Sequence, residues 1–152
     1  MAELAVRIAW LPDADQTLGL PARQTEGSAG FDLRANFGDR GAVMLAPGEI
    51  TLIPTGLQLE IPPGFEAQVR PRSGLALRHR ITLPNSPGTI DSDYRGPLGV
   101  IMHNGGAVPF TVNHGDRIAQ MVFAPVLSVA WHVVAAPGKS DRGVGGFGST
   151  GV

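Results

Sequence analysis

The stretch from residue 85 to residue 104 reads Asn85-Ser-Pro-Gly-Thr-Ile-Asp-Ser-Asp-Tyr-Arg-Gly96 and continues Pro97-Leu-Gly-Val-Ile-Met-His-Asn104. Its apolar residues around Val100 are typical of a strand, and residues 92–96 are typical of a turn. The pattern therefore predicts a β-hairpin that carries the carboxylate of Asp91 on its first arm and the ring of Tyr94 at its bend.

An aromatic side chain three residues after a carboxylate indicates a small planar or sugar-like ligand held beside a general base. The structural alternative is that Asp91 and Asp93 are ordinary turn acids and that Tyr94 packs on the barrel, since turns favour aspartate. This stretch alone leaves both interpretations open.

Length and composition exclude several classes of protein. A chain of 152 residues is most simply one domain with its own core. Its net charge of -1 gives no general attraction to nucleic acid or to an anionic membrane. No apolar run is long enough to span a bilayer, and Glu3 and Arg7 interrupt the N-terminal apolar stretch, so no secretory signal is predicted and the cytoplasm is expected. The absence of cysteine excludes disulfides, thiolate zinc sites and a cysteine nucleophile.

The 21 glycines and 13 prolines favour short strands joined by tight turns. Besides the central stretch, strands are predicted around Asp32 and at residues 5–10, 43–45, 49–54, 56–61, 65–69, 81–83, 110–112, 118–126 and 129–134. One short helix is predicted over residues 73–79, with Ser73 as its N-cap. We therefore expect an all-β, jelly-roll-like barrel over residues 1–136, followed by a glycine-rich arm over residues 137–152 that is mobile in isolation.

Two further groups of residues could take part in binding or catalysis. Arg72-Ser-Gly74 opens the predicted helix, where free backbone N–H groups and a planar guanidinium suit an anion; the alternative is a capped surface helix with a solvated arginine. Gly115-Asp-Arg-Ile-Ala-Gln120 puts the polar Arg117 and Gln120 at the edge of an apolar strand, although a turn followed by a strand explains the same pattern.

The tail, Asp141-Arg-Gly-Val-Gly-Gly-Phe-Gly-Ser-Thr-Gly151, could also hold an anion through its backbone N–H groups, its hydroxyls and Arg142. It lacks the Gly-Lys-Ser/Thr of a P-loop, and a glycine-rich end is usually just flexible. Phe147 favours binding, because an aromatic ring among glycines can stack on a base. The four histidines show no metal-ligand spacing.

Taken together and in this order, these groups resemble the motifs of the trimeric dUTPases, the deoxyuridine 5'-triphosphate nucleotidohydrolases. The resemblance covers residues 28–151 and all five family motifs: Ala29-Gly-Phe-Asp-Leu-Arg34, Pro71-Arg-Ser-Gly-Leu75, residues 85–96, Gly115-Asp-Arg-Ile-Ala-Gln120 and Arg142-Gly-Val-Gly-Gly-Phe-Gly-Ser149. Any one motif is a weak signal, whereas all of them in sequence at family-like spacing are a strong one.

The resemblance implies a dUTP diphosphatase that releases dUMP and pyrophosphate, limiting uracil incorporation into DNA and supplying dUMP for thymidylate synthesis. Asp91 is the expected general base, which deprotonates the water that attacks the α-phosphorus. Tyr94 is expected to lie against the deoxyribose. The expected contacts of the uracil edge are Asn85, Thr89, Ile90 and Gly99.

The same resemblance assigns the phosphates and the metal. The α- and β-phosphates are expected at Arg72, Ser73, Gly74 and Gln120. The γ-phosphate is expected at Arg142, Gly148 and Ser149, with Phe147 over the uracil. Mg²⁺ is expected to be held by phosphate oxygens and water without direct protein ligands, which leaves Asp32 in an outer-shell or structural role.

A homotrimer is also implied, in which the arm closes over a neighbour's site and each site draws on all three chains. Residues expected at or near subunit contacts are Ile118, Met121, Val122 and Phe123, although sequence alone does not separate interface from core. Two alternatives share the fold: a dCTP deaminase-like enzyme, and a nucleotide-binding regulator without turnover. A purely structural jelly-roll subunit is a weaker one.

Overall fold

The computed structural model describes residues 3–146. In chain order its elements are β1 (Arg7–Trp10), the 3-10 helix η1 (Gln16–Leu18), β2 (Phe31–Arg34), β3 (Ala42–Leu45), β4 (Ile50–Glu60), β5 (Phe65–Arg70), α1 (Ser73–His79), β6 (Ile81–Thr82), β7 (Gly88–Ile90), β8 (Pro97–Asn104), β9 (Phe110–Asn113) and β10 (Arg117–Pro125). The predicted fold class, all-β with one short α-helix, is confirmed.

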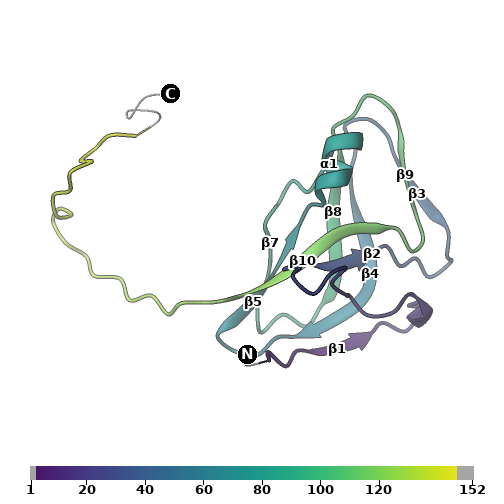
Figure 1. Cartoon of the computed structure of the whole chain (residues 1–152), viewed down its shortest axis with the longest axis horizontal. Helices are drawn as coiled ribbons and strands as arrows, with labels where there is room; N and C mark the ends of the chain where they lie inside the picture. Colours follow the sequence, from purple (N-terminus) through teal and green to yellow (C-terminus); the bar gives the residue numbers. More distant parts are fainter. Residues whose placement is uncertain (1–2, 147–152) are drawn as a thin grey trace.

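The strands form two four-stranded sheets and one two-stranded sheet (Figure 1). The first sheet has the order β1-β4-β8-β6 and the second has the order β2-β10-β5-β7, while β3 pairs with β9. Neighbouring strands pair antiparallel throughout the described part of the chain. The arrangement is the jelly-roll-like barrel that the sequence predicts.

One apolar core lies between the two sheets. In β8, Leu98, Val100 and Met102 are buried and alternate with half-exposed residues, so every second side chain faces inward. The second sheet contributes buried residues such as Val69 and Met121 to the same cluster. Full burial of one such side chain stabilises the fold by about 1.5–3 kcal/mol.

Strand β4 differs from the prediction of two strands, at residues 49–54 and 56–61. It is continuous from Ile50 to Glu60, and its pairing with β8 shifts between Pro54 and Leu57. Gly56 has a φ of 72°, which allows the chain to bulge there. A positive φ at a glycine does not therefore end the strand, because pairing resumes on the far side of the bulge.

The central stretch also pairs differently from the prediction. Strand β7 pairs with β5 in the second sheet, whereas β8 pairs with β4 and β6 in the first. The predicted hairpin is therefore wrong as a strand pairing: residues 91–96 carry the chain from one sheet to the other. The reason is that each arm finds a longer neighbour in its own sheet, and strand propensity does not specify the partner.

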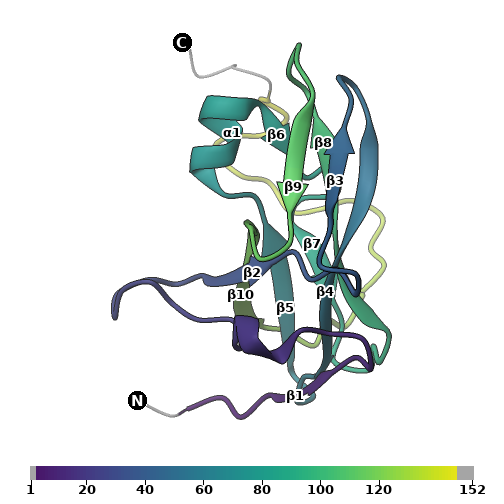
Figure 2. The ribbon, with the colours of Figure 1, turned by 90° about the vertical axis from the view of Figure 1, so that its right-hand side faces the viewer.

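Helix α1 has the predicted bounds but a different cap. Arg72 is the N-cap residue, with φ -95° and ψ 127°, and its side chain makes no capping hydrogen bond. Ser73 is already helical, so its predicted capping role is wrong. Strand β5 ends at Arg70 because Pro71 has no N–H to donate. The helix lies at the end of the barrel opposite β1 (Figure 2).

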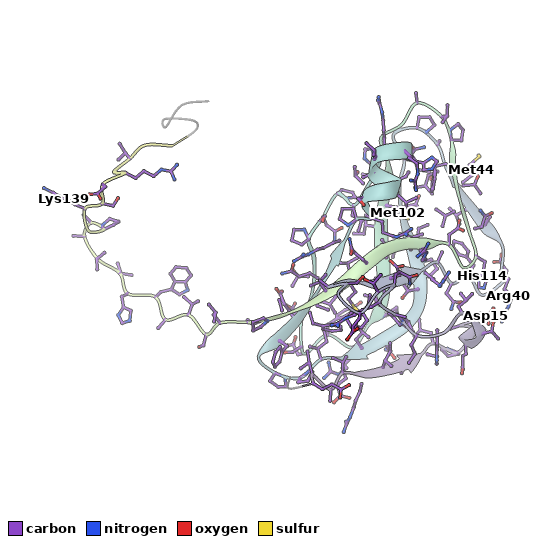
Figure 3. All side chains as sticks on the ribbon, viewed as in Figure 1. Asp15, Arg40, Met44, Met102, His114 and Lys139 are labelled. Atoms are coloured by element: carbon purple, nitrogen blue, oxygen red, sulfur yellow. The ribbon has the colours of Figure 1, made fainter. Side chains whose placement is uncertain are left out.

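Residues 126–146 contain no strand and extend away from the barrel (Figure 1). The strand predicted over residues 129–134 is therefore absent, although its alternation is present: Val129, Trp131 and Val133 are all exposed, Trp131 to 88%. An alternating apolar segment forms a strand only against a sheet edge, and no edge among residues 3–146 lies beside it. Lys139, which is labelled in Figure 3, lies on this extended segment, away from the barrel. Among residues 3–146, no helix has the length and apolar character needed to cross a membrane.

Candidate active site

Arg72 and Arg117 share one carboxylate, that of Asp32 on β2. Asp32 Oδ1 lies 3.4 Å from Arg72 Nε, and Arg117 Nη1 donates to Asp32 Oδ2 over 3.0 Å. Arg72 Nη1 also donates to the backbone oxygen of Arg117 over 2.9 Å. These contacts fix the orientation of the Arg72 guanidinium, and we call the three residues the arginine clamp.

The strand register brings further polar side chains to the same place. Gln120 on β10 lies directly opposite Asp32 on β2 and opposite Arg70 on β5, so the three residues form a row across the second sheet. Gln120 Nε2 donates to the Pro71 oxygen over 3.0 Å. Arg70 is a candidate that sequence reasoning missed, although its place directly after Val69, on the strand face opposite the buried Ala67 and Val69, could have indicated it.

These residues line an open cavity of about 340 Å³ beside the arginine clamp. Its lining residues are Gln24, Ser28, Ala29, Gly30, Asp32, Arg70, Arg72, Gln120 and Val122. Gly30 allows the observed position of Gln120, because a Cβ on it would collide with the side-chain oxygen of Gln120. Gly30 is thus a second residue whose role the sequence did not reveal. The cavity combines two arginines with amide and hydroxyl groups, which suits a ligand rich in anionic oxygens.

A second cavity of about 340 Å³ lies next to Arg72, Leu75, His79, Phe110, Thr111, Asp116, Arg117 and Ile118. Arg72 therefore borders both cavities. Ser73 is exposed and Gly74 is half-buried at the start of α1. A Cβ on Gly74 would come within 2.8 Å of Arg78 Nη2, so a further cationic group lies against this turn.

The predicted general base Asp91 and the aromatic Tyr94 lie on the turn between β7 and β8. Tyr94 N donates to the Asp91 oxygen over 3.2 Å and closes the turn, and Tyr94 Oη donates to the Pro97 oxygen over 3.1 Å. A Cβ on Gly96 would collide with the Tyr94 ring, so that glycine admits the observed ring position. Asp91 is exposed, and Tyr94 keeps 44% of its surface exposed, so both side chains are accessible.

The residues predicted at the uracil edge differ in their burial and in their neighbours. Asn85 and Thr89 are exposed and Ile90 is half-buried. A Cβ on Gly88 would come within 2.9 Å of Asn85 Nδ2, which makes Gly88 a neighbour of the Asn85 amide. Gly99 lies on the outer face of the first sheet, where a Cβ would come within 2.7 Å of Leu52 Cδ1.

Within residues 3–146, the cavities beside Arg72 and the turn that carries Asp91 are separate groups. Neither of the two cavities beside Arg72 is lined by Asp91, Tyr94 or the residues of the predicted uracil edge. Of the residues predicted at the γ-phosphate, Arg142 lies on the extended segment, where its Nε donates to the Gly145 oxygen over 2.8 Å. Phe147, Gly148 and Ser149 lie outside the described residues.

Comparison with known proteins gives the context of this arrangement. The family model described as dUTPase matches residues 16–151. A protein named deoxyuridine 5'-triphosphate nucleotidohydrolase from Roseobacter denitrificans is 57% identical over 151 residues, covering 99% of each chain. One of the same name from Desulfotalea psychrophila is 52% identical over 151 residues, with 99% of each chain covered.

Among solved structures, the dUTPase of Staphylococcus bacteriophage 80alpha with dUPNHPP superposes with a TM-score of 0.84 at 25% identity, covering 97% of this chain and 99% of that one. The dUTPase of phage phi11 of S. aureus, described with a structural Mg(II) ion, has a TM-score of 0.73 at 23% identity and covers 87% of this chain and 97% of its own. The family model extends over most of the chain, and the curated relatives match it from end to end. This chain belongs to the dUTPase family.

Proposed function

We propose that the protein hydrolyses dUTP to dUMP and pyrophosphate. The observation that carries this proposal is the arginine clamp beside the cavity that Gln120 and Arg70 also line. Fixed guanidinium groups bind phosphate oxygens through paired hydrogen bonds, and a clamp already oriented by Asp32 loses little conformational freedom when the phosphates bind.

Asp91 acts as the general base. Its carboxylate takes a proton from a water molecule as the water oxygen attacks the α-phosphorus. The bond between the α-phosphorus and the bridging oxygen breaks, and pyrophosphate leaves with that oxygen. The exposed position of Asp91 on a turn gives a water molecule access to it.

The nucleoside lies along the turn between β7 and β8. Tyr94 packs against the deoxyribose and leaves no room for a 2'-hydroxyl. The uracil edge is recognised by backbone groups of Thr89, Ile90 and Gly99 together with the Asn85 amide, with Gly88 close enough to position that amide. A pocket that hydrogen-bonds one base edge rejects a base with a different pattern of donors and acceptors.

Mg²⁺ fits this site as a partner of the triphosphate. Both oxygens of Asp32 face arginine side chains, and residues 3–146 contain no cluster of three or more His, Asp or Glu that could hold a metal. The ion, held by phosphate oxygens and water, would neutralise charge on the triphosphate. Asp32 itself orients Arg72 and Arg117.

The complete site needs more than one chain. Neither cavity beside Arg72 is lined by Asp91, which supports a site that combines groups from neighbouring copies. Arg142, Phe147, Gly148 and Ser149 of the C-terminal arm close over the phosphates and base of a neighbour. We propose a homotrimer with three such shared sites.

The residues predicted at or near subunit contacts, Ile118, Met121, Val122 and Phe123, are partly used within one chain. Ile118 and Met121 belong to the core of a single chain. Phe123 packs edge-on against Phe31, with their ring centroids 5.9 Å apart. The first sheet instead exposes Leu52 to 64%, and residues 129–133 expose an alternating apolar edge. These surfaces are the ones we assign to contacts between copies.

One assay tests the proposal: purified protein is incubated with dUTP and Mg²⁺, and the products are separated by chromatography. We expect dUMP and pyrophosphate. Formation of dUTP from supplied dCTP would instead identify a deaminase, and binding of dUTP without products would identify a regulator of the same fold.

A further inference from the structure

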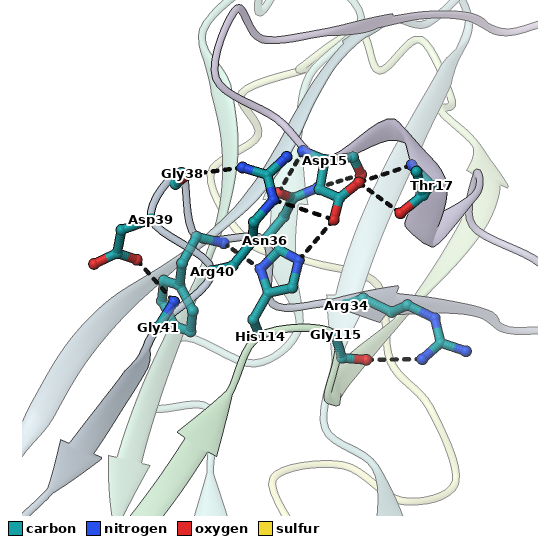
Figure 4. Close-up of polar contacts among 11 residues, drawn as sticks. Asp15, Thr17, Arg34, Asn36, Gly38, Asp39, Arg40, Gly41, His114 and Gly115 are labelled. Carbon is teal, nitrogen blue, oxygen red and sulfur yellow. Dashed lines mark hydrogen bonds and ion pairs between the residues drawn. The ribbon is translucent and has the colours of Figure 1, made fainter.

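A half-buried polar cluster lies at the edge of the barrel, outside all the groups described above. Its centre is Asp15, just before η1 (Figure 4). Asp15 Oδ1 accepts hydrogen bonds from Thr17 N over 2.9 Å and from Thr17 Oγ1 over 2.6 Å. Asp15 Oδ2 lies 3.1 Å from His114 Nε2 and 3.6 Å from Arg40 Nε. The Asp15 and His114 side chains are only 14% and 13% exposed.

The hydrogen bonds of His114 define the protonation of its ring. Phe37 N lies 3.1 Å from His114 Nδ1, and a backbone N–H can only donate. Nδ1 is therefore the acceptor, and Nε2 carries the proton that is donated to Asp15 Oδ2. The imidazole thus connects the segment before η1 to the loop between β2 and β3.

His114 belongs to the turn that connects β9 to β10. Gly115 N donates to the Ala35 oxygen over 2.8 Å, and Ala35 N donates to the Asp116 oxygen over 2.8 Å. Arg34 Nη1 donates to the Gly115 oxygen over 2.7 Å. The position of this turn is therefore set by β2 on one side and by the Asp15 cluster on the other.

The residue that follows this turn is Arg117, a member of the arginine clamp. Its guanidinium contacts Asp32 and its backbone oxygen accepts from Arg72. A shift of the turn moves both of these atoms at once. Because Arg72 takes its orientation from Asp32 and from the Arg117 oxygen, such a shift reorients the Arg72 guanidinium.

We propose that Asp15 and His114 are positioning residues that hold the β9–β10 turn and thereby set the Arg72 guanidinium for the phosphates of the substrate. The proposal rests on the proposed function, because it takes the triphosphate as the ligand of Arg72. Neither residue lies in the dUTPase motifs that the sequence displays, and neither contacts the cavities beside Arg72. Their influence is exerted through the turn.

The test measures binding of two probes to the full-length protein: inorganic tripolyphosphate with Mg²⁺, and deoxyuridine, which has no phosphate. For His114→Ala we expect tripolyphosphate affinity to fall about tenfold, as for loss of a charge-assisted hydrogen bond, while deoxyuridine affinity is unchanged. His114→Gln keeps a donor for Asp15 and should restore part of the lost affinity.

The matched control is Asn104→Ala. Asn104 is fully buried and donates to the backbone oxygens of Leu45 and Val108, which is a comparable loop attachment with no connection to the clamp. We expect this variant to lower the melting temperature without a change in tripolyphosphate affinity. Equal losses of tripolyphosphate affinity in the Asn104 and His114 variants would overturn the proposal.

A second measurement keeps the test decisive if His114→Ala does not fold. His114→Gln is then compared in the wild-type and Arg117→Ala backgrounds. If His114 acts through Arg117, its substitution has a smaller effect on tripolyphosphate affinity in the Arg117→Ala background, where only the backbone oxygen of residue 117 still connects the turn to Arg72; fully additive effects would contradict this. A wild-type protein that hydrolyses no dUTP refutes the proposed function, whereas a hydrolase with unaffected His114 variants refutes only the present inference.

Discussion

Arginine side chains supply the positive charge of the candidate site, and one carboxylate determines how they lie. Asp32 contacts Arg72 through one carboxylate oxygen and Arg117 through the other. These ion pairs restrict the orientation of both guanidinium groups. A carboxylate beside a phosphate site is repulsive on its own. Paired with two arginines it leaves a net positive group whose hydrogen-bond donors point in fixed directions.

At the same scale, Asp91 is the residue on which turnover depends. We expect Asp91→Asn to abolish dUTP hydrolysis, because an amide cannot accept the proton of the attacking water. Affinity for dUTP should stay close to that of the wild type, since size and shape are kept. Initial-rate kinetics and equilibrium binding measure the two quantities separately, and retained turnover would remove Asp91 as the base.

Gly30 is the second residue to test. A Cβ at this position would displace the side chain of Gln120 from the cavity and break its hydrogen bond to the Pro71 oxygen. We expect Gly30→Ala to raise KM for dUTP about fivefold, corresponding to one lost hydrogen bond. Gln120→Ala should give a similar KM, and the double variant should be no worse than either one.

At the scale of elements, the bulge in β4 connects the barrel to the segment before η1. The Gly56 oxygen accepts from Leu11 N over 2.8 Å, and the Pro54 oxygen accepts from Asn36 N over 2.9 Å. Pro54 is the last residue paired with β8 before the bulge, and Gly56 lies within the bulge. An irregularity in one strand thus provides the attachment for two loops.

A pair of glycine variants isolates the packing around this bulge. Gly56 and Gly48 both have positive φ, 72° and 80°, but only at Gly56 would a Cβ meet Ala14 Cβ, at 2.7 Å, while Gly48 has open space. We expect Gly48→Ala to lose about 1 kcal/mol from backbone strain and Gly56→Ala to lose about 1–3 kcal/mol more from crowding. Urea unfolding gives both values; equal losses would show that the loop yields to the added methyl group.

The segment before η1 also makes stability depend on pH. The hydrogen bond from the Thr17 side chain lowers the pKa of Asp15 most, followed by the bond from Thr17 N, the bond to His114 and the charge of Arg40; together they bring it from 3.8 to about 2. A lowered pKa means that the folded state favours the charged form. The stabilisation is therefore complete above pH 3.8 and is lost as the pH falls through about 2.

Asp15→Asn tests that dependence. The difference in unfolding free energy between wild type and variant should be largest above pH 3.8 and should shrink as the pH approaches 2. Denaturant unfolding at a series of pH values measures it. A difference that stays constant over this range would mean that the Asp15 carboxylate does not contribute through its charge.

At the scale of the whole molecule, the proposed functional groups lie on separate parts of the described chain. Neither of the two cavities beside Arg72 is lined by the turn that carries Asp91, and Arg142 lies on a segment that extends away from the barrel (Figure 1). Residues 129–133 expose alternating apolar side chains, and we propose that this segment pairs with another copy of the chain. Assembly and catalysis are therefore expected to depend on the same segment.

Complementation between two inactive chains tests the shared sites. We expect deletion of residues 141–152 to reduce turnover strongly and to leave a folded trimer. A mixture of this deletion with Asp91→Asn, refolded together, should regain activity, because some sites combine an intact Asp91 with an intact arm from another chain. Activity in the mixture no higher than in the separate variants would show that each chain completes its own site.

The sequence by itself determined most strands, the bounds of α1 and the identity of the motif residues. The alternation of apolar and polar residues and the Pro-Gly turns are local properties of the sequence, so they can be recognised without knowledge of the partner strands. The same holds for the residue types of the arginine clamp, since Asp32, Arg72 and Arg117 all stand within motifs.

Only the tertiary structure decided which segments meet. It assigned β7 and β8 to different sheets, joined the two predicted halves of β4 through a bulge, and turned Asp32 towards two arginines. It also left residues 129–134 without a partner. The physical reason is that strand pairing and ion pairing are contacts between residues far apart in the chain, and their geometry follows from how the core packs as a whole.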